Sequence, residues 1–374
     1  MKYSIEVGKI VEGALKRDQV KVINYCEQLV SKLELDGEAR TAEKFKKILE
    51  SKKIETMSPL KGYSSSIPVD SESRVSLADI IYPSDNTVET ILRSDNERQI
   101  KEFIQNYQNA DKLQSVGLKI TNTLLLYGPP GTGKTNTALM IAKKLNLPIV
   151  IARLDSLISS YLGTTAKNIR MLFEFVEKLP CLLLLDEFDA IAKARDDSNE
   201  LGELKRVVNS LLQNIDSIGK ESLIIASTNH EQLLDSAVWR RFNYQIEIGL
   251  PDVESIVRMI PLFIKGKVVF DEKELLELAI CLEGLSGSDI EEILHKAQRT
   301  AIIKGDVFSI NYIFEEIFMR ENISGTSSDS KHQQAKYLKT KNRNRKIFTL
   351  DSIGEIVGLS KGHLSTILKE DNDE

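Results

Sequence analysis

Three short runs of apolar residues divide the middle of the chain, and amphipathic segments lie between them. The runs at 123–127, 181–185 and 222–228 contain no charged residue. Uninterrupted runs of this length are typical of strands buried on both faces of a parallel sheet. The intervening segments 136–145 and 165–177 favour helices. The pattern therefore predicts an α/β fold, in which helices flank a buried parallel sheet.

Amphipathic helices are expected on both sides of this α/β region. Near the N-terminus, Val20, Ile23, Val30 and Leu33 recur at helical spacing. Similar patterns occur after residue 251, where Pro251-Asp252 is a typical helix start. The expected helices cover 4–17, 18–35, 37–52, 97–113, 252–264, 272–282, 287–304 and 309–321.

A glycine-rich turn follows the first apolar run and precedes a predicted helix. Residues 128–135 match GxxxxGK[ST] in full. A strand that feeds such a turn points several backbone N–H groups, and the positive end of the helix dipole, at one spot that suits a polyphosphate. We expect Lys134 to reach the β- and γ-phosphates of ATP and the Thr135 hydroxyl to bind Mg²⁺. The predicted nucleotide-binding residues of the turn are Pro130, Gly131, Thr132, Gly133, Lys134, Thr135 and Asn136.

Polar residues follow the second and third apolar runs. Asp186 and Glu187 come directly after the second, and Asn229 comes after the third. Ligands bind outside the carboxyl ends of buried parallel strands. Asp186 is therefore expected to hold Mg²⁺, Glu187 to polarise the attacking water, and Asn229 to sense the γ-phosphate or orient that water.

In this order, the motifs resemble those of AAA+ ATPases of the AAA clade, over about residues 75–322. The segment 235–242 resembles their second region of homology, where two arginines project into the neighbouring subunit's nucleotide site. The adjacent pair Arg240 and Arg241 is most similar to the katanin and spastin group. The resemblance implies a P-loop NTPase sheet with a helical lid, in a ring that is expected to be a hexamer. Both arginines would stabilise the transferred phosphoryl group in trans; a surface salt bridge is the alternative.

The segment before the helix at 165–177 resembles the pore loop of AAA unfoldases. It contains Tyr161, Leu162 and Gly163, an aromatic-hydrophobic-glycine order. In that family the aromatic residue grips an extended polypeptide in the central channel. The alternative is a helix-capping turn with Tyr161 packed on the domain. A second pore loop is expected within 193–203, which is polar and charged.

The resemblance also suggests how the chain is divided. Ile80 and Ile81 occupy the place where the family packs apolar side chains around adenine, and 287–289 resembles the Gly-Ala-Asp that replaces the sensor-2 arginine. The expected segments are a helical N-terminal domain at 1–55, a serine- and proline-rich linker at 56–74, a large α/β subdomain at 75–250, a helical lid at 251–322, a basic linker at 323–346 and a C-terminal module at 347–374.

The C-terminal module resembles a helix-turn-helix. Gly354 stands at its small-residue position, Gly358 at the turn, and Leu364 and Ile367 on the apolar face of a second helix. With the basic run before it, such a module could bind DNA. Two features oppose this: only two helices are evident, and the last five residues are mostly acidic. The alternative interpretation, a helical module that docks on protein, therefore remains.

Composition and the absence of certain motifs exclude some classes of protein. A net charge of −5 argues against general polyanion binding by the whole chain, and the three cysteines form no pair motif. No apolar run of 18 residues and no signal-peptide pattern is present, so we expect a cytoplasmic protein without a membrane anchor. His230–Leu234 lacks the second histidine of HExxH, which argues against a fused zinc protease, although a separate protease partner stays open.

The sequence therefore predicts an ATPase that uses ATP and Mg²⁺. It resembles prokaryotic single-cassette members of the AAA clade, and this implies a homo-oligomeric ring that remodels or unfolds protein substrates through its pore. The alternatives are a DNA-directed motor or loader and an ATP-switched DNA-binding regulator.

Overall fold

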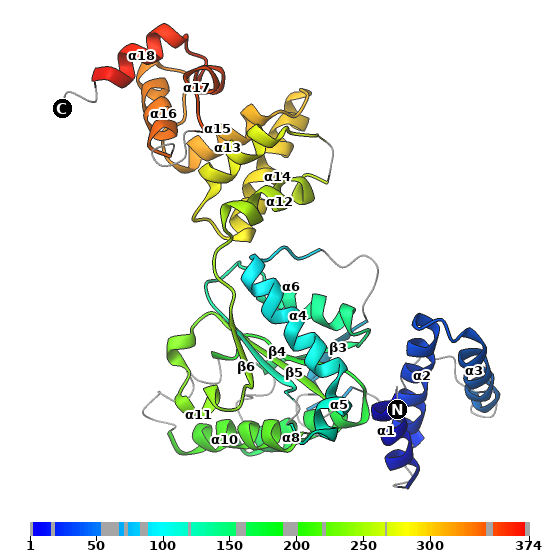
Figure 1. The fold of residues 1–374 in the computed structure, drawn as a ribbon. Helices are drawn as coiled ribbons and strands as arrows, with labels where there is room; N and C mark the ends of the chain where they lie inside the picture. Colours follow the sequence, from blue (N-terminus) through cyan, green and yellow to red (C-terminus); the bar gives the residue numbers. More distant parts are fainter. Residues whose placement is uncertain are drawn as a thin grey trace. The chain divides into compact units, whose positions relative to one another are not determined.

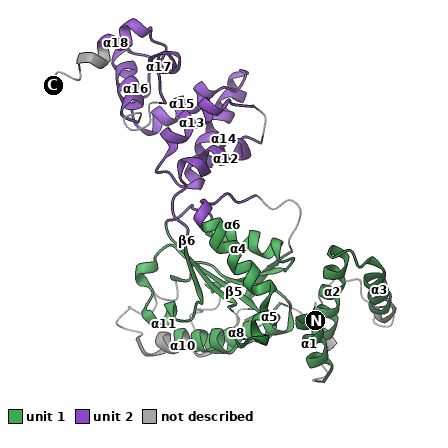
Figure 2. Ribbon diagram, in the orientation of Figure 1, with its two compact units in different colours: residues 1–88, 96–128, 134–247 green, residues 89–95, 129–133, 248–374 purple. Residues whose placement is uncertain are grey.

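The computed structural model divides the chain into two compact units (Figure 2). Unit 1 comprises 1–88, 96–128 and 134–247, and unit 2 comprises 89–95, 129–133 and 248–374. The residues that the structure describes are 3–15, 19–53, 67–70, 74–82, 89–118, 121–154, 162–189, 201–218, 222–265, 268–341 and 347–370.

Unit 1 is built on a six-stranded sheet in the order β1-β3-β4-β5-β2-β6. The five strands from β3 to β6 pair in parallel, and β1 pairs antiparallel with β3 at one edge. The strands are β1 (Ala78–Ile81), β2 (Thr123–Tyr127), β3 (Ile149–Ala152), β4 (Leu182–Leu185), β5 (Leu223–Thr228) and β6 (Tyr244–Glu247). Every residue of β4 and β5 is buried, as the uninterrupted apolar runs predict. The α/β prediction is confirmed.

Helices flank this sheet (Figure 1). They are α4 (Ser94–Gln108), α5 (Ala110–Ser115), α6 (Lys134–Lys144), α8 (Leu162–Lys178), α10 (Leu201–Ser217) and α11 (Ser236–Trp239). Side chains of α8 and α10 join β4 and β5 in one apolar core, which includes Leu172, Leu211 and Leu183. The helix expected at 97–113 is divided between α4 and α5, with Asn109 at the break.

The three N-terminal helices form at the expected places: α1 (Ser4–Leu15), α2 (Gln19–Leu35) and α3 (Ala39–Lys53). They belong to unit 1 and do not form a unit of their own. The Asn24 amide on α2 donates a hydrogen bond of 3.3 Å to the Lys178 carbonyl oxygen at the end of α8. Burial raises the pKa of Tyr25, and the neighbouring Tyr107 and Cys181 add to the rise. The buried face of α2 thus explains why the helical segment packs on the α/β part.

Unit 2 contains the expected lid helices: α12 (Val253–Phe263), α13 (Glu272–Leu282), α14 (Gly287–Lys304) and α15 (Ile310–Arg320). Capping side chains define the starts of the first three. Asp252 and Asp271 accept hydrogen bonds from backbone N–H groups in the first turns of α12 and α13, and Ser286 does the same for α14. Gly305, in a left-handed conformation, ends α14.

The segment 323–346, which we expected to be a linker, contains a helix instead. The helix α16 (Ser328–Lys341) buries Ala335 and Leu338 in the same apolar core as the lid helices. The Tyr337 hydroxyl also donates a hydrogen bond of 3.4 Å to the Cys281 carbonyl oxygen on α13. Polar and basic residues surround these three positions, so the short apolar face is hard to recognise in the sequence. The C-terminal helices α17 (Leu350–Val357) and α18 (Lys361–Glu370) share this core through Ile353, Val357 and Leu364.

We predict that replacing Leu338 with alanine will destabilise the lid as well as α16. Leu338 is fully buried, and leucine-to-alanine changes in protein cores typically cost about 2–5 kcal/mol. Hydrogen exchange in α13 and α14 should become faster in Leu338→Ala. Gln333→Ala, on the exposed side of α16, is the matched control and should leave that exchange unchanged. Unchanged exchange in Leu338→Ala would mean that α16 is not part of the lid core.

Candidate active site

The glycine-rich turn connects β2 to α6, which begins at Lys134. The Lys134 ammonium donates a hydrogen bond of 2.9 Å to the Gly128 carbonyl oxygen. Burial lowers the pKa of Lys134, and the nearby Asp186 carboxylate opposes that shift. A buried cation at the start of a helix, on a turn rich in glycine, is a site for a polyphosphate.

Gly131 has a positive φ of 73° and lies against the start of α14, within unit 2. Its carbonyl oxygen accepts a hydrogen bond of 3.1 Å from the Ser288 N–H, and a Cβ at this position would overlap the Ser288 hydroxyl. Only glycine satisfies both the backbone angle and the close approach. The segment 287–289, singled out in the sequence, is therefore in contact with the phosphate-binding turn.

The carboxylate of Asp186 links the ends of three strands. It follows β4, and the sheet order separates β4 from β2 by β5. The Thr135 hydroxyl, after β2, donates a hydrogen bond of 2.7 Å to Asp186 Oδ2. The Ser227 hydroxyl, on β5, donates to Asp186 Oδ1. A hydroxyl and a carboxylate side by side are hard oxygen donors of the kind that Mg²⁺ prefers, so these residues fit the ion.

Glu187 adopts a left-handed backbone conformation, with φ of 53°. This conformation costs an ordinary residue roughly 1–2 kcal/mol. Two backbone contacts hold it: the Glu187 N–H donates to Asp186 Oδ1 at 3.1 Å, and the Phe188 N–H donates to the Ser227 carbonyl oxygen at 2.8 Å. The Glu187 side chain is exposed at the edge of the sheet where the strands end. Its position suits a group that must reach a water molecule.

Sequence reasoning missed the side chains at the end of β5 that support these acids. In addition to Ser227, the Thr228 hydroxyl donates a hydrogen bond of 3.0 Å to Asp189 Oδ1, and both residues are buried. Hydroxyl residues just before Asn229 were the available indication, because polar groups inside a buried strand need hydrogen-bond partners. Asn229 itself is partly buried at the end of β5.

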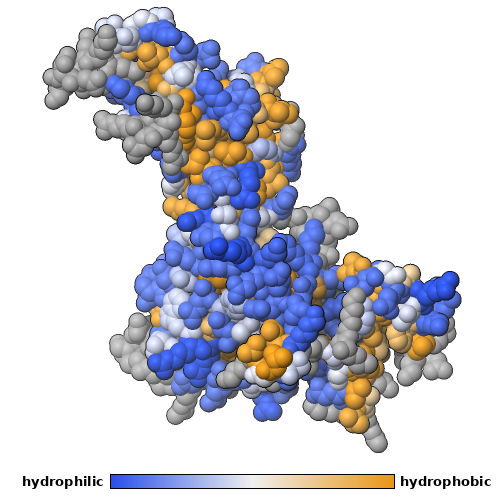
Figure 3. Space-filling view, in the orientation of Figure 1, coloured by the Kyte–Doolittle hydropathy of each residue, from blue (hydrophilic) through white to orange (hydrophobic). Residues whose placement is uncertain are grey.

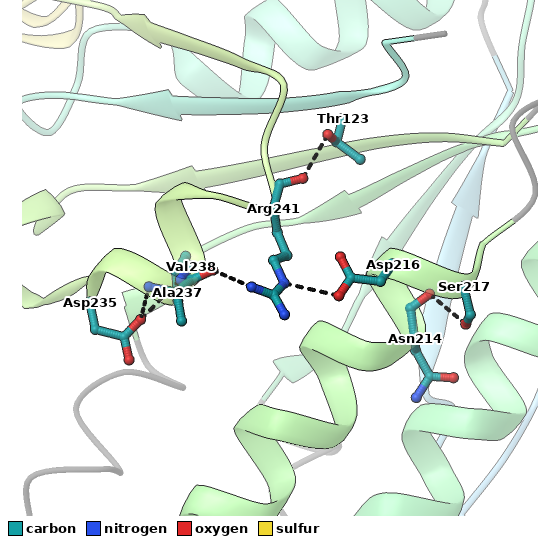
Figure 4. Close-up of polar contacts among 8 residues, drawn as sticks. All are labelled: Thr123, Asn214, Asp216, Ser217, Asp235, Ala237, Val238 and Arg241. Carbon is teal, nitrogen blue, oxygen red and sulfur yellow. Dashed lines mark hydrogen bonds and ion pairs between the residues drawn. The ribbon is translucent and has the colours of Figure 1, made fainter. Parts of the chain in front are cut away.

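The two arginines of the predicted finger pair have different surroundings, and Figure 4 shows those of Arg241. Arg241 Nε lies 3.0 Å from Asp216 Oδ2 on α10, and its Nη1 donates to the Ala237 carbonyl oxygen at 3.4 Å. Arg240 is exposed. Arg241 therefore forms a salt bridge, which was the alternative considered for this pair. Arg240 has the more accessible guanidinium.

The predicted adenine contacts do not lie beside the phosphate-binding turn. Ile80 and Ile81 belong to β1, the edge strand, which β3, β4 and β5 separate from β2. Four strand spacings of about 4.8 Å put β1 nearly 20 Å from β2. Ile80 instead packs against the apolar core, and Ile81 is 42% exposed. The segment pairs with β3, and its contact with adenine stays a prediction. The segment 89–95 comes closer, since Thr90 is the neighbour that a Cβ on Gly133 would meet, at 3.9 Å.

The predicted pore-loop residues are only partly described. Tyr161 and 193–200 lie outside the described residues, and Leu162 and Gly163 form the first turn of α8. In the part of the chain that the structure describes, no helix is both long and apolar enough to cross a membrane.

Comparison with known proteins agrees with this geometry. A sequence model of the ATPase family associated with various cellular activities (AAA) matches residues 124–250. An uncharacterized AAA family ATPase, y4kL, from Sinorhizobium fredii is 39% identical over 280 residues, which cover 75% of this chain and 84% of the relative. The chain therefore belongs to the AAA family of ATPases, and it is an enzyme that hydrolyses ATP.

More distant relatives share the ATPase part. The ATP-dependent zinc metalloprotease FtsH 2 of Symbiobacterium thermophilum is 31% identical over 215 residues, which cover 55% of this chain and 37% of that protein. The FtsH protein of Thermus thermophilus is 31% identical over 216 residues, covering 56% and 35%. The chain thus spans about a third of the length of these FtsH proteins. The crystal structure of the FIGL-1 AAA domain is similar in fold, with a TM-score of 0.55 at 21% identity, over 64% of this chain and 85% of that one.

We predict that Ser227→Ala will raise the Mg²⁺ concentration needed for half-maximal ATP hydrolysis. The Ser227 hydroxyl orients Asp186, and loss of such an outer partner typically weakens metal affinity or activity by about 10–100-fold. A Mg²⁺ titration of the steady-state rate measures the effect. Ser217→Ala, which removes a hydroxyl bound to the Asn214 carbonyl oxygen on α10, should leave the requirement unchanged. An unaltered requirement in Ser227→Ala would contradict the assigned role of Asp186.

Proposed function

We propose that the protein is a ring-forming ATPase that couples ATP hydrolysis to the remodelling or unfolding of protein substrates. The proposal that the protein forms a ring rests on the positions of Arg240 and Arg241. The Thr123 hydroxyl, at the start of β2, donates a hydrogen bond of 2.9 Å to the Arg241 carbonyl oxygen. The phosphate-binding turn begins at the other end of β2, roughly 16 Å away at 3.3 Å per residue. Neither Arg240 nor Arg241 is placed to reach the phosphates bound by its own chain.

A second copy of the chain would supply the positive charge of an arginine to the bound phosphates. In phosphoryl transfer, an arginine from a neighbouring protein can stabilise the transition state and raise the rate by orders of magnitude. Arg240 is exposed and follows directly on the capped helix α11. The ion pair with Asp216 gives Arg241 a role within its own chain. We therefore assign the trans-acting role to Arg240, in a closed ring of like subunits that is expected to be a hexamer.

The remaining steps belong to residues of one chain. Lys134 would bind the β- and γ-phosphates, and Thr135 and Asp186 would hold Mg²⁺. When bound, this ion supplies positive charge that neutralises the phosphate oxygens. Glu187 would accept a proton from the attacking water, and Asn229 would orient that water. The exposed Glu187 carboxylate and its fixed backbone support this assignment.

The protein substrate is proposed from the sequence segment 160–163 and from the relatives. The segment has the order Ser-Tyr-Leu-Gly, and the FtsH relatives are named as ATP-dependent proteases. An aromatic side chain with few torsions to fix provides contact area for a chain of any sequence. The HExxH motif of zinc proteases is absent from this sequence, so the proposed activity is limited to remodelling or unfolding. A separate protease partner stays a prediction.

We predict that an unfolded polypeptide such as casein will stimulate ATP hydrolysis by the wild-type protein, and that Tyr161→Ala will abolish this stimulation. The aromatic ring is expected to transmit contact with the substrate, so its loss should leave basal hydrolysis in place. The steady-state rate with and without casein measures both quantities. Tyr161→Phe keeps the ring and should retain most of the stimulation.

The same assay separates protein remodelling from a DNA-directed motor. Stimulation by duplex DNA alone, with equal rates in wild type and Tyr161→Ala, would reject a protein substrate. Equal casein stimulation in wild type and Tyr161→Ala would reject the pore-loop assignment.

A further inference from the structure

The last three helices form a compact trihelical module (Figure 1). Between α17 and α18 lie three residues, 358–360, and Gly358 has a positive φ of 70°. The N–H groups of Gly358 and Leu359 both donate to the Gly354 carbonyl oxygen, at 2.8 and 3.0 Å. Two short helices joined by a three-residue turn that contains glycine have the form of a helix-turn-helix.

The packing of the turn supports this assignment. A Cβ on Gly354 would lie 2.7 Å from the Leu359 carbonyl oxygen, so α17 approaches the turn too closely for a side chain at this position. Leu364 on α18 is fully buried. The helix α16 supplies the third helix that was not evident in the sequence, and the Lys331 ammonium donates to the Gly358 carbonyl oxygen at 3.2 Å. The module therefore has the three helices that DNA-binding helix-turn-helix domains such as homeodomains use.

The outer face of α18 is polar. Lys361, His363 and Thr366 are exposed, and they are side chains that can donate hydrogen bonds to phosphates or base edges. Among the side chains of 328–341 and 347–366, the most exposed large apolar one is Leu350, at 37%. The lid differs: Val269, Ile303 and Val307 are all more than 80% exposed, and Figure 3 shows apolar surface over its helices. Among the module's side chains that the structure describes, large apolar groups are thus less exposed than on the lid, which argues against docking on protein.

The segment that begins with α16 is rich in positive charge. Residues 328–346 contain seven lysines and arginines and one aspartate, although the whole chain has a net charge of −5. His332 and Lys336 are four residues apart on α16, and so share one side of the helix. The ring centroids of His332 and His363 are 5.8 Å apart, so this side adjoins the outer face of α18. The ion pair of Lys361 with Asp351 is exposed on both sides, and such pairs contribute little to stability.

We infer that the α16–α18 module binds duplex DNA. The helix α18 enters the major groove, and the lysines of α16 contact the phosphates on the flank. The module shares its apolar core with α13 and α14, so the bound DNA is attached to the lid through packed helices. This inference is independent of the proposed protein substrate, because it rests on a surface far along the chain from the residues that hydrolyse ATP.

The test is binding of the full-length protein to a fluorescently labelled duplex of about 30 base pairs and mixed sequence, followed by anisotropy at several salt concentrations. At 50 mM NaCl the wild type should bind with a dissociation constant in the low micromolar range, because non-specific complexes are strengthened at low salt. Thr366→Glu places a carboxylate on the outer face of α18 and should weaken binding at least about tenfold. Lys336→Gln should reduce the salt slope by about one unit if it removes one phosphate contact.

A matched control is available on α14. Lys296 is an exposed lysine on this helix, 2.8 Å from Glu292, and Lys296→Gln should bind DNA like the wild type. All three variants should keep wild-type basal ATP hydrolysis, which verifies that they fold. Absence of duplex binding at 50 mM NaCl, or equal affinity and salt slope in wild type, Thr366→Glu and Lys336→Gln, would overturn the inference. The face would then belong to a protein partner.

Discussion

The carboxylate of Asp186 is the contact on which the active site depends. It extends from β4 to the Thr135 hydroxyl beyond β2 and to the Ser227 hydroxyl on β5. A parallel sheet brings the carboxyl ends of its strands to one edge, and hydrogen bonds between side chains then fix the distances across that edge. The same carboxylate accepts the Glu187 N–H, and so stabilises the left-handed backbone that exposes the Glu187 side chain. The residues proposed to bind phosphate, hold Mg²⁺ and activate water therefore share one physical support.

The sequence was sufficient to predict the elements that depend on residues close together in the chain. The phosphate-binding turn, the acids after β4 and the lid helices each depend on residues close together in the chain, and the structure has them at the predicted places. Long-range pairing was less predictable. Ile80 and Ile81 were singled out as adenine contacts, and the sequence did not indicate that their strand pairs with β3. The sequence likewise could not distinguish Arg241 from Arg240, because Asp216 lies 25 residues before Arg241.

The helix α16 is a second element that the sequence did not predict. Its sequence is mostly polar and basic, and only Gln334, Ala335 and Leu338 among its residues are buried. Three positions are too few to give a clear helical period, so composition alone suggests a linker. The lid provides the apolar surface that makes the helix stable. Once α16 is in place, the segments at 350–357 and 361–370 gain the third helix on which the inferred DNA-binding role depends.

The central claim is that each nucleotide site is completed by Arg240 of another copy. The most direct test mixes two variants: Arg240→Ala, which keeps its own catalytic residues, and Glu187→Gln, which keeps its finger. Each alone should hydrolyse ATP poorly. In a random equal mixture, about a quarter of the sites would combine an intact Glu187 with an intact neighbouring Arg240, so activity should recover to that fraction of wild type. Wild-type turnover by Arg240→Ala alone, or a mixture as inactive as its components, would contradict the account.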